Sequence, residues 1–316
     1  MRKPVVFMFS GQGSQSFQMG RELYDHHPRF RLWMDLCDRL VGEATGRSLL
    51  SVLFEKDRAE VFDDLLFTNP ALLSVEFCLA TVLQEAGIHP DYLLGYSLGE
   101  FTAAVVSGVL TLEEGIELTV DLARLMQAKA VPGGMLAILG NESLPEAYPQ
   151  AFAEMTVSAR NFASNFVVSG TAEKISALQT VLAGLGITTQ RLAVRYGFHS
   201  PVIEPLKADF LRLAEGFNYL PPRVPLISAV ATGPIDHIDE LHLWRAIVKP
   251  VDFRITIERM INQKACLFMD AGPSGSLATA VKYILPKDSR SGFLQTINPY
   301  GRDCEALKKA IMHFQN

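Results

Sequence analysis

The chain has 316 residues, 48% of them hydrophobic, so it can bury one large core or a large core and a small one. Its net charge is −5 and it contains no long basic run, which excludes the electrostatic footprint of a nucleic-acid-binding protein. The four cysteines form no CxxC pair and have no histidine at ligand spacing, so we expect neither a metal site nor a disulfide framework.

The compartment is predicted from the thiols and from the first residues. Isolated cysteines are typical of a reducing compartment. The apolar run near the N-terminus meets glycines and polar residues too early for a signal peptide or a membrane span. We therefore expect a cytoplasmic protein with no membrane partner.

The first predicted element is a strand over residues 4–10, an almost continuously apolar run of the kind buried in the centre of a parallel sheet. Residues 21–46 and 70–87 then carry apolar residues at helical spacing. Residues 91–109 contain a short strand that passes through Ser97 directly into a helix. This alternation of strands and helices predicts an α/β fold with a mainly parallel sheet.

The pattern changes between residues 133 and 194, where the predicted order is β, α, β, β, α, β. That order is the ferredoxin-like split βαβ arrangement. We therefore predict a small subdomain over 133–194, inserted into a large domain made of 1–132 and 195–316. Within the subdomain we expect helices in 143–155 and 172–186, and after it further strands of the large domain in 224–230, 265–272 and 292–297.

Ser97 is the first candidate for chemistry. It lies between Gly95 and Gly99 at a strand-to-helix junction, the pattern of a nucleophile on a sharp turn. The amide of Leu98 begins the helix, where it could stabilise an oxyanion. The alternative is a glycine-rich turn in which serine caps the helix, and these residues alone leave both interpretations open.

Two further residues could complete such a site. His199 follows the predicted subdomain directly, where the chain re-enters the large domain, and is the candidate base; the alternative is an ordinary loop histidine. Gln12 lies between two glycines after the first strand and could supply a second oxyanion donor from its carboxamide; the alternative is a glycine turn. A phosphate-binding loop is excluded because neither GxGxxG nor GxxxxGK[ST] occurs there.

Several segments together resemble malonyl-CoA:acyl-carrier-protein transacylases and the acyltransferase domains of polyketide synthases. They occur in the family's order and span nearly the whole chain, at residues 9–15, 95–110, 125–127, 159–170, 197–206, 250–253 and 270–277. The resemblance implies an α/β-hydrolase-like large domain with an inserted ferredoxin-like subdomain. It also implies that Ser97 attacks a thioester, with His199 as general base, to give an acyl-serine. In the family a backbone carbonyl orients the histidine, and we expect that carbonyl at Ala246.

One position departs from the family. Malonyl-transferring members resemble RGxxMQ after the serine, and their arginine pairs with the malonyl carboxylate. Aligned on Met126 and Gln127, this chain has Leu122 at the arginine position. Arg124 lies two residues further along the helix, about 200° away. Burying a carboxylate against leucine costs several kcal/mol more than pairing it with guanidinium, so we expect an uncharged acyl group. Arg195 is the candidate for a relocated cation.

Two more residues are expected beside the acyl group. Tyr96 stands where most members have histidine, which changes the polarity next to Ser97. Phe198 is retained at the position that the family associates with unbranched malonyl units, a preference that means little without the arginine.

Freestanding members without the arginine resemble the acyl hydrolases of polyketide pathways whose modules have no built-in acyltransferase. The resemblance therefore predicts hydrolysis of stalled acyl groups from acyl carrier protein. Transfer of an uncharged acyl group from CoA or a carrier protein to a carrier protein stays open, and malonyl transfer would need a relocated cation. A non-catalytic scaffold would predict loss of Ser97, His199 or Gln12, and all three are present. We expect a monomer with no resident cofactor, because phosphopantetheine comes with the substrate.

Overall fold

The large domain is built around β1 (Val5–Phe9), which is buried along its whole length. In the computed structural model, which describes residues 2–298 and 300–315, β1 lies inside a six-stranded sheet of order β11-β10-β1-β2-β7-β8. All neighbours in this sheet are parallel except β8, which runs antiparallel at one edge. The other strands are β2 (Tyr92–Gly95), β7 (Leu226–Ser228), β8 (Gly233–Ile235), β10 (Leu267–Asp270) and β11 (Gly292–Gln295). The predicted α/β fold with a mainly parallel sheet and a central first strand is confirmed.

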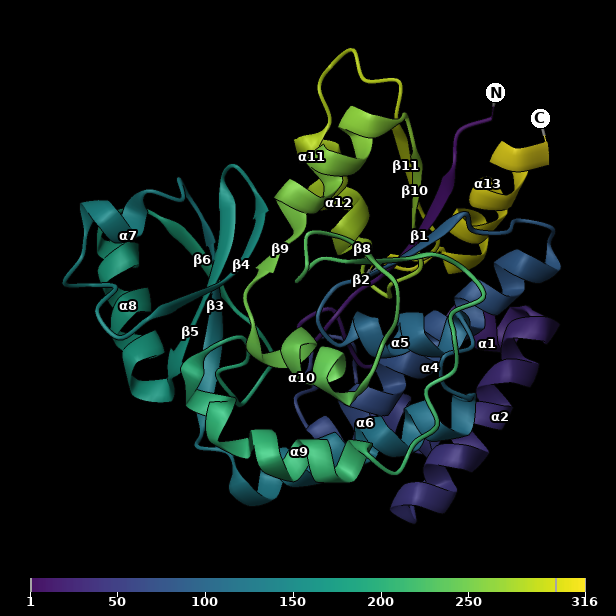
Figure 1. Cartoon of the computed structure of the whole chain (residues 1–316), viewed down its shortest axis with the longest axis horizontal. Helices are drawn as coiled ribbons and strands as arrows, with labels where there is room; N and C mark the ends of the chain where they lie inside the picture. The colour runs from purple at the N-terminus through teal and green to yellow at the C-terminus, as the bar shows by residue number, and fades with distance from the viewer. Residues whose placement is uncertain (1, 299, 316) are drawn as a thin grey trace.

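The small lobe holds a second sheet, drawn in teal in Figure 1. Its strands follow the order β6-β3-β5-β4-β9, and the first four are antiparallel neighbours in the ferredoxin-like arrangement. They are β3 (Gly133–Leu139), β4 (Thr156–Phe162), β5 (Asn165–Thr171) and β6 (Thr188–Arg191). The fifth strand, β9 (Val251–Asp252), pairs in parallel with β4 and comes from far outside the 133–194 segment. This strand is not predicted from the sequence, because a two-residue strand has no periodicity to detect.

The chain enters and leaves the small lobe at adjacent points. Pro132 and Tyr196 form an isolated antiparallel bridge, and the amide of Gly133 donates to the carbonyl of Arg195 at 2.8 Å. The helices of this lobe are α7 (Leu144–Ala147) and α8 (Ala172–Gly184). The helix expected within 143–155 is reduced to α7, because Pro149 disfavours helical geometry at the residue before it.

Helices surround the large sheet (Figure 1). The apolar pattern over 21–46 forms two helices, because Pro28 occupies the first turn of the second and His27 caps it, accepting from the amide of Phe30 through Nδ1. The helices of the large domain are α1 (Arg21–His26), α2 (Pro28–Thr45), α3 (Leu49–Leu53), α4 (Leu65–Glu85), α5 (Gly99–Val106), α6 (Leu112–Lys129), the 3₁₀-helix η1 (Pro201–Leu206), α9 (Lys207–Ala214), α10 (Glu240–Val248), α11 (Phe253–Gln263), α12 (Ser276–Ile284) and α13 (Asp303–Gln315).

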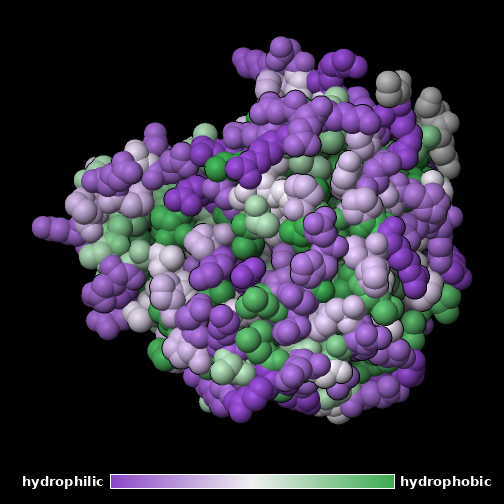
Figure 2. Space-filling model, viewed as in Figure 1, coloured by the Kyte–Doolittle hydropathy of each residue, from purple (hydrophilic) through white to green (hydrophobic). Residues whose placement is uncertain are grey.

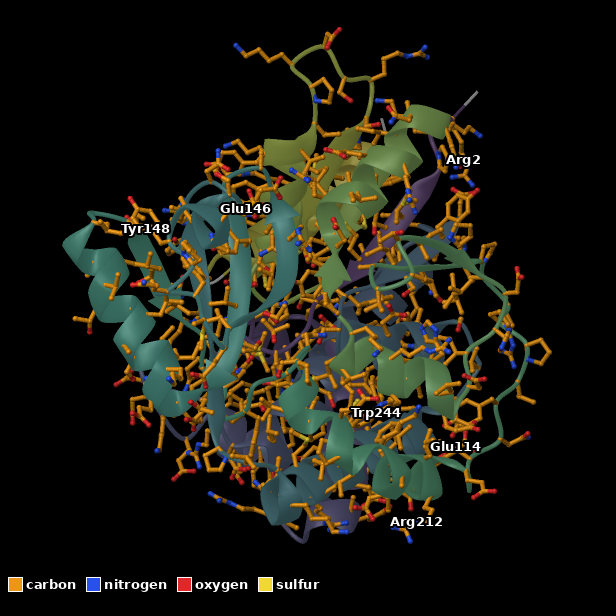
Figure 3. All side chains as sticks on the ribbon, turned by 60° about the vertical axis from the view of Figure 1, so that its left-hand side comes forward. Arg2, Glu114, Glu146, Tyr148, Arg212 and Trp244 are labelled. Carbon is orange, nitrogen blue, oxygen red and sulfur yellow. The ribbon has the colours of Figure 1, made fainter. Side chains whose placement is uncertain are left out.

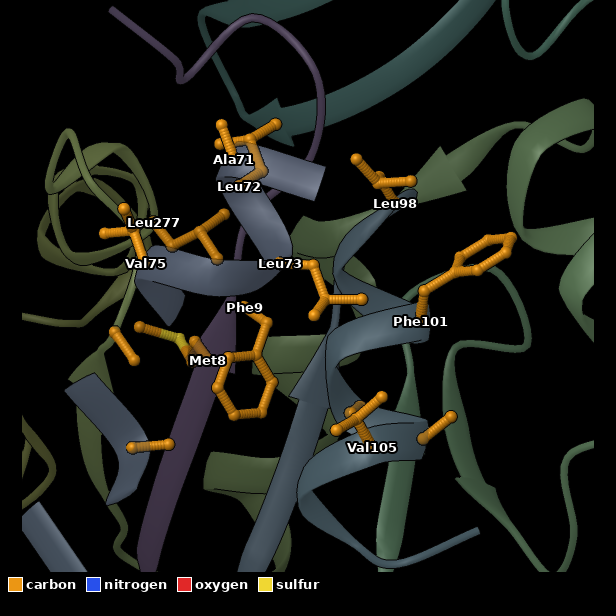
Figure 4. Packing of buried hydrophobic residues seen from close by; sticks show 14 of the residues in the cluster. Met8, Phe9, Ala71, Leu72, Leu73, Val75, Leu98, Phe101, Val105 and Leu277 are labelled. Atoms are coloured by element: carbon orange, nitrogen blue, oxygen red, sulfur yellow. The ribbon is translucent and has the colours of Figure 1, made fainter. Parts of the chain in front are cut away.

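Helix α4 is apolar on all sides because it runs through the core. Among the described residues it is the one helix long and apolar enough to cross a membrane, yet 83% of its apolar window is buried inside the protein. Its side chains pack with β1 and α5: Figure 4 shows Leu73 of α4 close to Phe9 and Phe101. On the face seen in Figure 2, hydrophilic residues dominate and hydrophobic residues lie scattered between them.

The turn from β2 into α5 depends on Gly99. A Cβ at Gly99 would lie 2.1 Å from the carbonyl oxygen of Phe9, which is backbone of the neighbouring strand and cannot rotate away. The absence of a side chain therefore lets α5 begin directly against the end of β1.

We expect Gly99→Ala to lower the free energy of unfolding by about 3 kcal/mol, as overpacking against fixed backbone does. The matched control is Gly42→Ala in α2, where a Cβ meets nothing within 4 Å. There alanine should raise the free energy by about 0.5–1 kcal/mol, because glycine is a poor helix former. The free energies of unfolding of both variants are measured by urea unfolding, monitored by circular dichroism. Equal effects of the two substitutions would contradict the packing argument.

Candidate active site

Two loops meet at the carboxyl edge of the large sheet. Because β1 and β2 are parallel neighbours, with Phe9 opposite Gly95, the loops that follow them emerge side by side. A Cβ at Gly11 in the first loop would lie 2.8 Å from the Cβ of Ser97 in the second. The glycine therefore brings the backbone of the first loop into direct contact with the candidate nucleophile.

Ser97 occupies a strained turn. Its φ is +57°, in the left-handed region that non-glycine residues rarely adopt, and α5 begins two residues later. A Cβ at Gly95 would lie 2.6 Å from the Cα of Glu100, so the turn has no space for a larger residue there. This is the strand-to-helix turn that the sequence pattern around Ser97 predicts.

His199 lies within hydrogen-bond distance of Ser97. Its Nε2 is 2.7 Å from the Ser97 hydroxyl, although 101 residues separate the two in the chain. Both are buried, with exposed fractions of 2% for His199 and 7% for Ser97. The structure therefore brings together the two residues that the sequence proposed as nucleophile and base.

The other ring nitrogen determines the direction of that hydrogen bond. Nδ1 of His199 is 2.7 Å from the carbonyl oxygen of Lys249, which can only accept, so Nδ1 carries the hydrogen. Burial lowers the pKa of His199 to about 4, although the bond to the Lys249 carbonyl raises it in part. The neutral ring therefore presents an unprotonated Nε2 that accepts the hydroxyl hydrogen of Ser97.

The orienting carbonyl was predicted at the wrong residue. Ala246 lies inside α10, whereas Lys249 follows the helix with extended geometry (φ −87°, ψ 147°), which frees its carbonyl from the helix axis. Pro250 provides the physical reason, since the residue before a proline is pushed out of helical geometry. Another carbonyl of α10, that of Ile247, accepts from the backbone amide of His199 at 2.9 Å.

Two backbone amides in the loops that meet at Ser97 are candidate oxyanion donors. Among the described residues, the amide N–H groups of Leu98 and Gln12 have no hydrogen-bond acceptor. The Gln12 carboxamide was expected to donate here, and that prediction is wrong: it donates to Thr68 Oγ1 at 2.9 Å and Asn69 Oδ1 at 2.5 Å, both on α4. The side chain anchors the loop, and the backbone amide is the group left free.

A buried carboxyl group of α4 supports the same loop. Glu76 of α4 accepts from the amide and the hydroxyl of Ser10, at 2.6 and 2.7 Å, and from the hydroxyl of Thr102 at 2.8 Å. Burial raises the pKa of Glu76 to about 8, although these hydrogen bonds oppose the shift. Glu76 thus ties the first loop to α5, the helix that follows Ser97.

The three predicted substrate contacts lie in different surroundings. Leu122 is buried on α6, one turn beyond Thr119, whose carbonyl accepts from Asn69 at 3.1 Å. Phe198 is buried beside His199, and its carbonyl accepts from Ser169 at 2.6 Å.

Tyr96 reaches from the nucleophile turn into the small lobe. Its hydroxyl donates to Asn161 Oδ1 of β4 at 2.9 Å, and burial raises its pKa. Tyr96 is therefore a link between the two lobes next to Ser97.

Arg195, the candidate for a relocated cation, and Arg124, which the helix geometry rules out, are both exposed and paired with acidic side chains. Arg195 is exposed and forms an ion pair with Asp63 at 2.6 Å. Arg124 is exposed and forms an ion pair with Asp121 at 3.1 Å. No arginine or lysine in the part of the chain that the structure describes is fully buried.

Several residues that support the site are not predicted from the sequence. The Lys249 carbonyl could have been found from Pro250, which ends α10. Asn69 and Glu76 left no such signal, because they lie in the apolar pattern of α4 and their partners are distant in sequence.

The groups collected here are those needed for acyl transfer through an ester. The serine hydroxyl can attack a carbonyl, the neutral imidazole can take its proton, and the amides can bind the resulting oxyanion. Each of the two hydrogen bonds to the imidazole is 2.7 Å long.

Comparison with known proteins places this arrangement in a family. The acyl transferase domain model matches residues 6–309. The chain is 36% identical to the polyketide biosynthesis acyltransferase homolog PksD of Bacillus subtilis, covering 97% of this chain and 95% of that protein. It is 37% identical to the homolog BaeD of Bacillus velezensis, covering 98% and 96%. A loading acyltransferase from the avermectin modular polyketide synthase superposes with a TM-score of 0.89 at 25% identity, covering 99% of this chain and 100% of that chain. The chain therefore belongs to the acyl transferase domain family.

Proposed function

We propose that this protein is a serine acyl hydrolase of polyketide biosynthesis. It takes uncharged acyl groups from acyl carrier protein as an ester of Ser97 and releases them to water, which clears stalled carriers. The freestanding relatives PksD and BaeD, whose names assign them to polyketide biosynthesis and which match this chain over almost their full length, support the pathway. The carrier protein is the proposed partner, and its phosphopantetheine arm makes a resident cofactor unnecessary.

The observation that carries the acyl preference is Leu122. It is 1% exposed on α6, at the position where malonyl-transferring members have arginine. The exposed guanidinium of Arg195 is engaged with Asp63 and does not replace the missing charge. A malonyl carboxylate would lie against an aliphatic side chain, whereas each CH₂ of an uncharged chain buried there contributes about 0.8 kcal/mol.

The proposed reaction has two halves that use the same base. Ser97 Oγ attacks the thioester carbonyl as its proton moves to Nε2 of His199, and the amides of Leu98 and Gln12 stabilise the oxyanion. The C–S bond breaks, and the leaving thiolate takes the proton. Water then attacks the acyl-serine, gives a proton to His199 and releases the carboxylic acid, and Ser97 regains the proton.

Acyl transfer to a carrier protein is the second candidate function. Its first half-reaction, formation of the acyl-serine, is the same as that of hydrolysis, so the geometry of Ser97 and His199 supports both equally. The loading acyltransferase to which the chain is similar is named for transfer. In that case a phosphopantetheine thiol takes the place of water in the second half, and access to the acyl-serine decides between the two reactions.

Ser97→Ala should abolish covalent acylation, because it removes the nucleophile while the fold keeps its glycines. Intact mass spectrometry after incubation with acetyl, butyryl and malonyl thioesters of acyl carrier protein detects the acyl-enzyme directly. Ser107→Ala is the matched control, since Ser107 is a buried serine at the far end of α5. Acylation of the Ser97→Ala protein would contradict the proposed chemistry.

The acylation rate should depend on pH through His199. The neutral ring is the active form, and its pKa of about 4 means that it stays neutral down to mildly acidic pH. We therefore expect the rate to be level from neutral pH down to about pH 5 and to fall tenfold per unit well below pH 4. Single-turnover acylation after pH jumps tests this, and a fall centred at pH 6.5 would contradict a buried neutral base.

Leu122→Arg should admit malonyl groups, because the guanidinium supplies the charge that a buried carboxylate needs. We expect the ratio of malonyl to acetyl acylation of Ser97 to rise at least about tenfold, or about 1.4 kcal/mol. Leu122→Gln, polar but uncharged, controls for the loss of leucine. If both variants keep the wild-type ratio, Leu122 does not face the acyl group.

A further inference from the structure

A second buried acidic side chain lies on α5, the helix that follows Ser97. Glu100 is three residues after Ser97 on α5 and is 1% exposed. One of its oxygens accepts from the hydroxyl of Ser228 at 2.5 Å, and the other lies 2.8 Å from Nε2 of His242. The proposed reaction does not use either member of the Glu100–His242 pair.

His242 belongs to the helix whose end holds the catalytic base. It lies on α10. Near the end of that helix the carbonyl of Ile247 accepts from the backbone amide of His199, and the carbonyl of Lys249, just after the helix, accepts from Nδ1 of His199. Trp244 makes α10 a fixed element: it is buried and packs against Phe210 with ring centroids 5.5 Å apart. Figure 3 shows Trp244 in the interior, with Glu146 and Tyr148 on the outer part of the small lobe.

The contact with Glu100 favours the protonated form of His242. Burial lowers the pKa of His242, but the hydrogen bond and the charge of Glu100 outweigh it, and the net shift is upward. Two further charges act on His242: Asp239, which caps α10, raises its pKa, and Arg245 on the same helix lowers it. A cavity of about 370 Å³, which also contains Asp236 and His237, borders His242 and gives protons a route to the ring.

We propose that the Glu100–His242 pair positions the catalytic dyad by clamping α10, which anchors His199, to α5, which carries Ser97. The 2.7 Å contact between Ser97 and His199 joins residues held by two different helices, and the Glu100–His242 bond links those helices directly. A displacement of about 1 Å at reacting atoms can cost a hundredfold in rate, so a link of this kind controls the chemistry without touching substrate.

The sign of the pH dependence follows from the raised pKa of His242. The protonated ring holds the carboxylate most strongly, so the clamp is complete below that pKa and weakens as pH rises through it. Loss of the clamp therefore produces an alkaline fall in Ser97 reactivity, distinct from the acidic fall caused by protonation of His199.

The test uses the full-length protein and a fluorophosphonate probe, which labels an activated serine whatever its acyl preference. The labelling rate of Ser97 is measured from pH 5 to pH 9.5 in the wild type, in Glu100→Gln and in His242→Gln. We expect the wild-type rate to fall severalfold on the alkaline side. Both variants should label about tenfold more slowly at pH 7 and lose the alkaline fall, with thermal unfolding as the check on folding. His237→Gln is the matched control, because His237 borders the same cavity but is 77% exposed, and it should leave rate and profile unchanged.

The outcomes separate this inference from the proposed function on which it rests. If the wild type is not labelled at Ser97, the dyad itself is wrong. If Ser97 is labelled but the wild-type rate has no alkaline fall, or if His242→Gln keeps the wild-type rate and profile, the clamp is wrong. If His242→Gln fails to fold, the double variant Glu100→Gln, His242→Gln replaces it, because it leaves no unpaired buried charge. A double variant that keeps the wild-type labelling rate and pH profile would likewise contradict the clamp.

Discussion

The hydrogen bond from Nδ1 of His199 to the carbonyl of Lys249 determines what the Ser97 hydroxyl can do. Because the carbonyl can only accept, the bond fixes the tautomer and leaves Nε2 free to take a proton. A carboxylate in the same place would hold the imidazolium more strongly, whereas a carbonyl leaves the pKa of the buried ring low. The imidazole of His199 is therefore neutral and able to accept a proton at neutral pH, without an acidic third residue.

The Lys249 carbonyl is available because it lies in the short segment between α10 and β9. Helix α10 stops before Pro250, and the chain continues into β9, which joins the sheet of the small lobe beside β4. The segment that carries Lys249 is therefore held by the large domain on one side and by the small lobe on the other. Tyr96 makes a second connection through Asn161, so both lobes contribute to the surroundings of Ser97.

The site also depends on close backbone packing. Glycine at positions 11 and 99 lets the two loops at the sheet edge touch, which leaves the amides of Gln12 and Leu98 free beside the serine. The loops are braced by buried polar side chains of α4, Asn69 and Glu76. A helix that is otherwise core thus supplies the support for a polar site, and its burial accounts for its apolar sequence.

The sequence alone determined the fold class, the central strand, the ferredoxin-like segment and the pairing of Ser97 with His199. These follow from local signals: apolar periodicity, glycines at fixed spacing, and motifs in a family order. The tertiary structure alone decided which atoms of these residues meet. In this structure the carbonyl that orients His199 belongs to Lys249 and not to Ala246, and the free donor of Gln12 is its backbone amide and not its carboxamide. The tertiary structure also brought Glu100 to His242, 142 residues away, and added β9 to the distant sheet. Such contacts join residues far apart in the chain, and a hydrogen bond has a direction and a length that no one-dimensional pattern records.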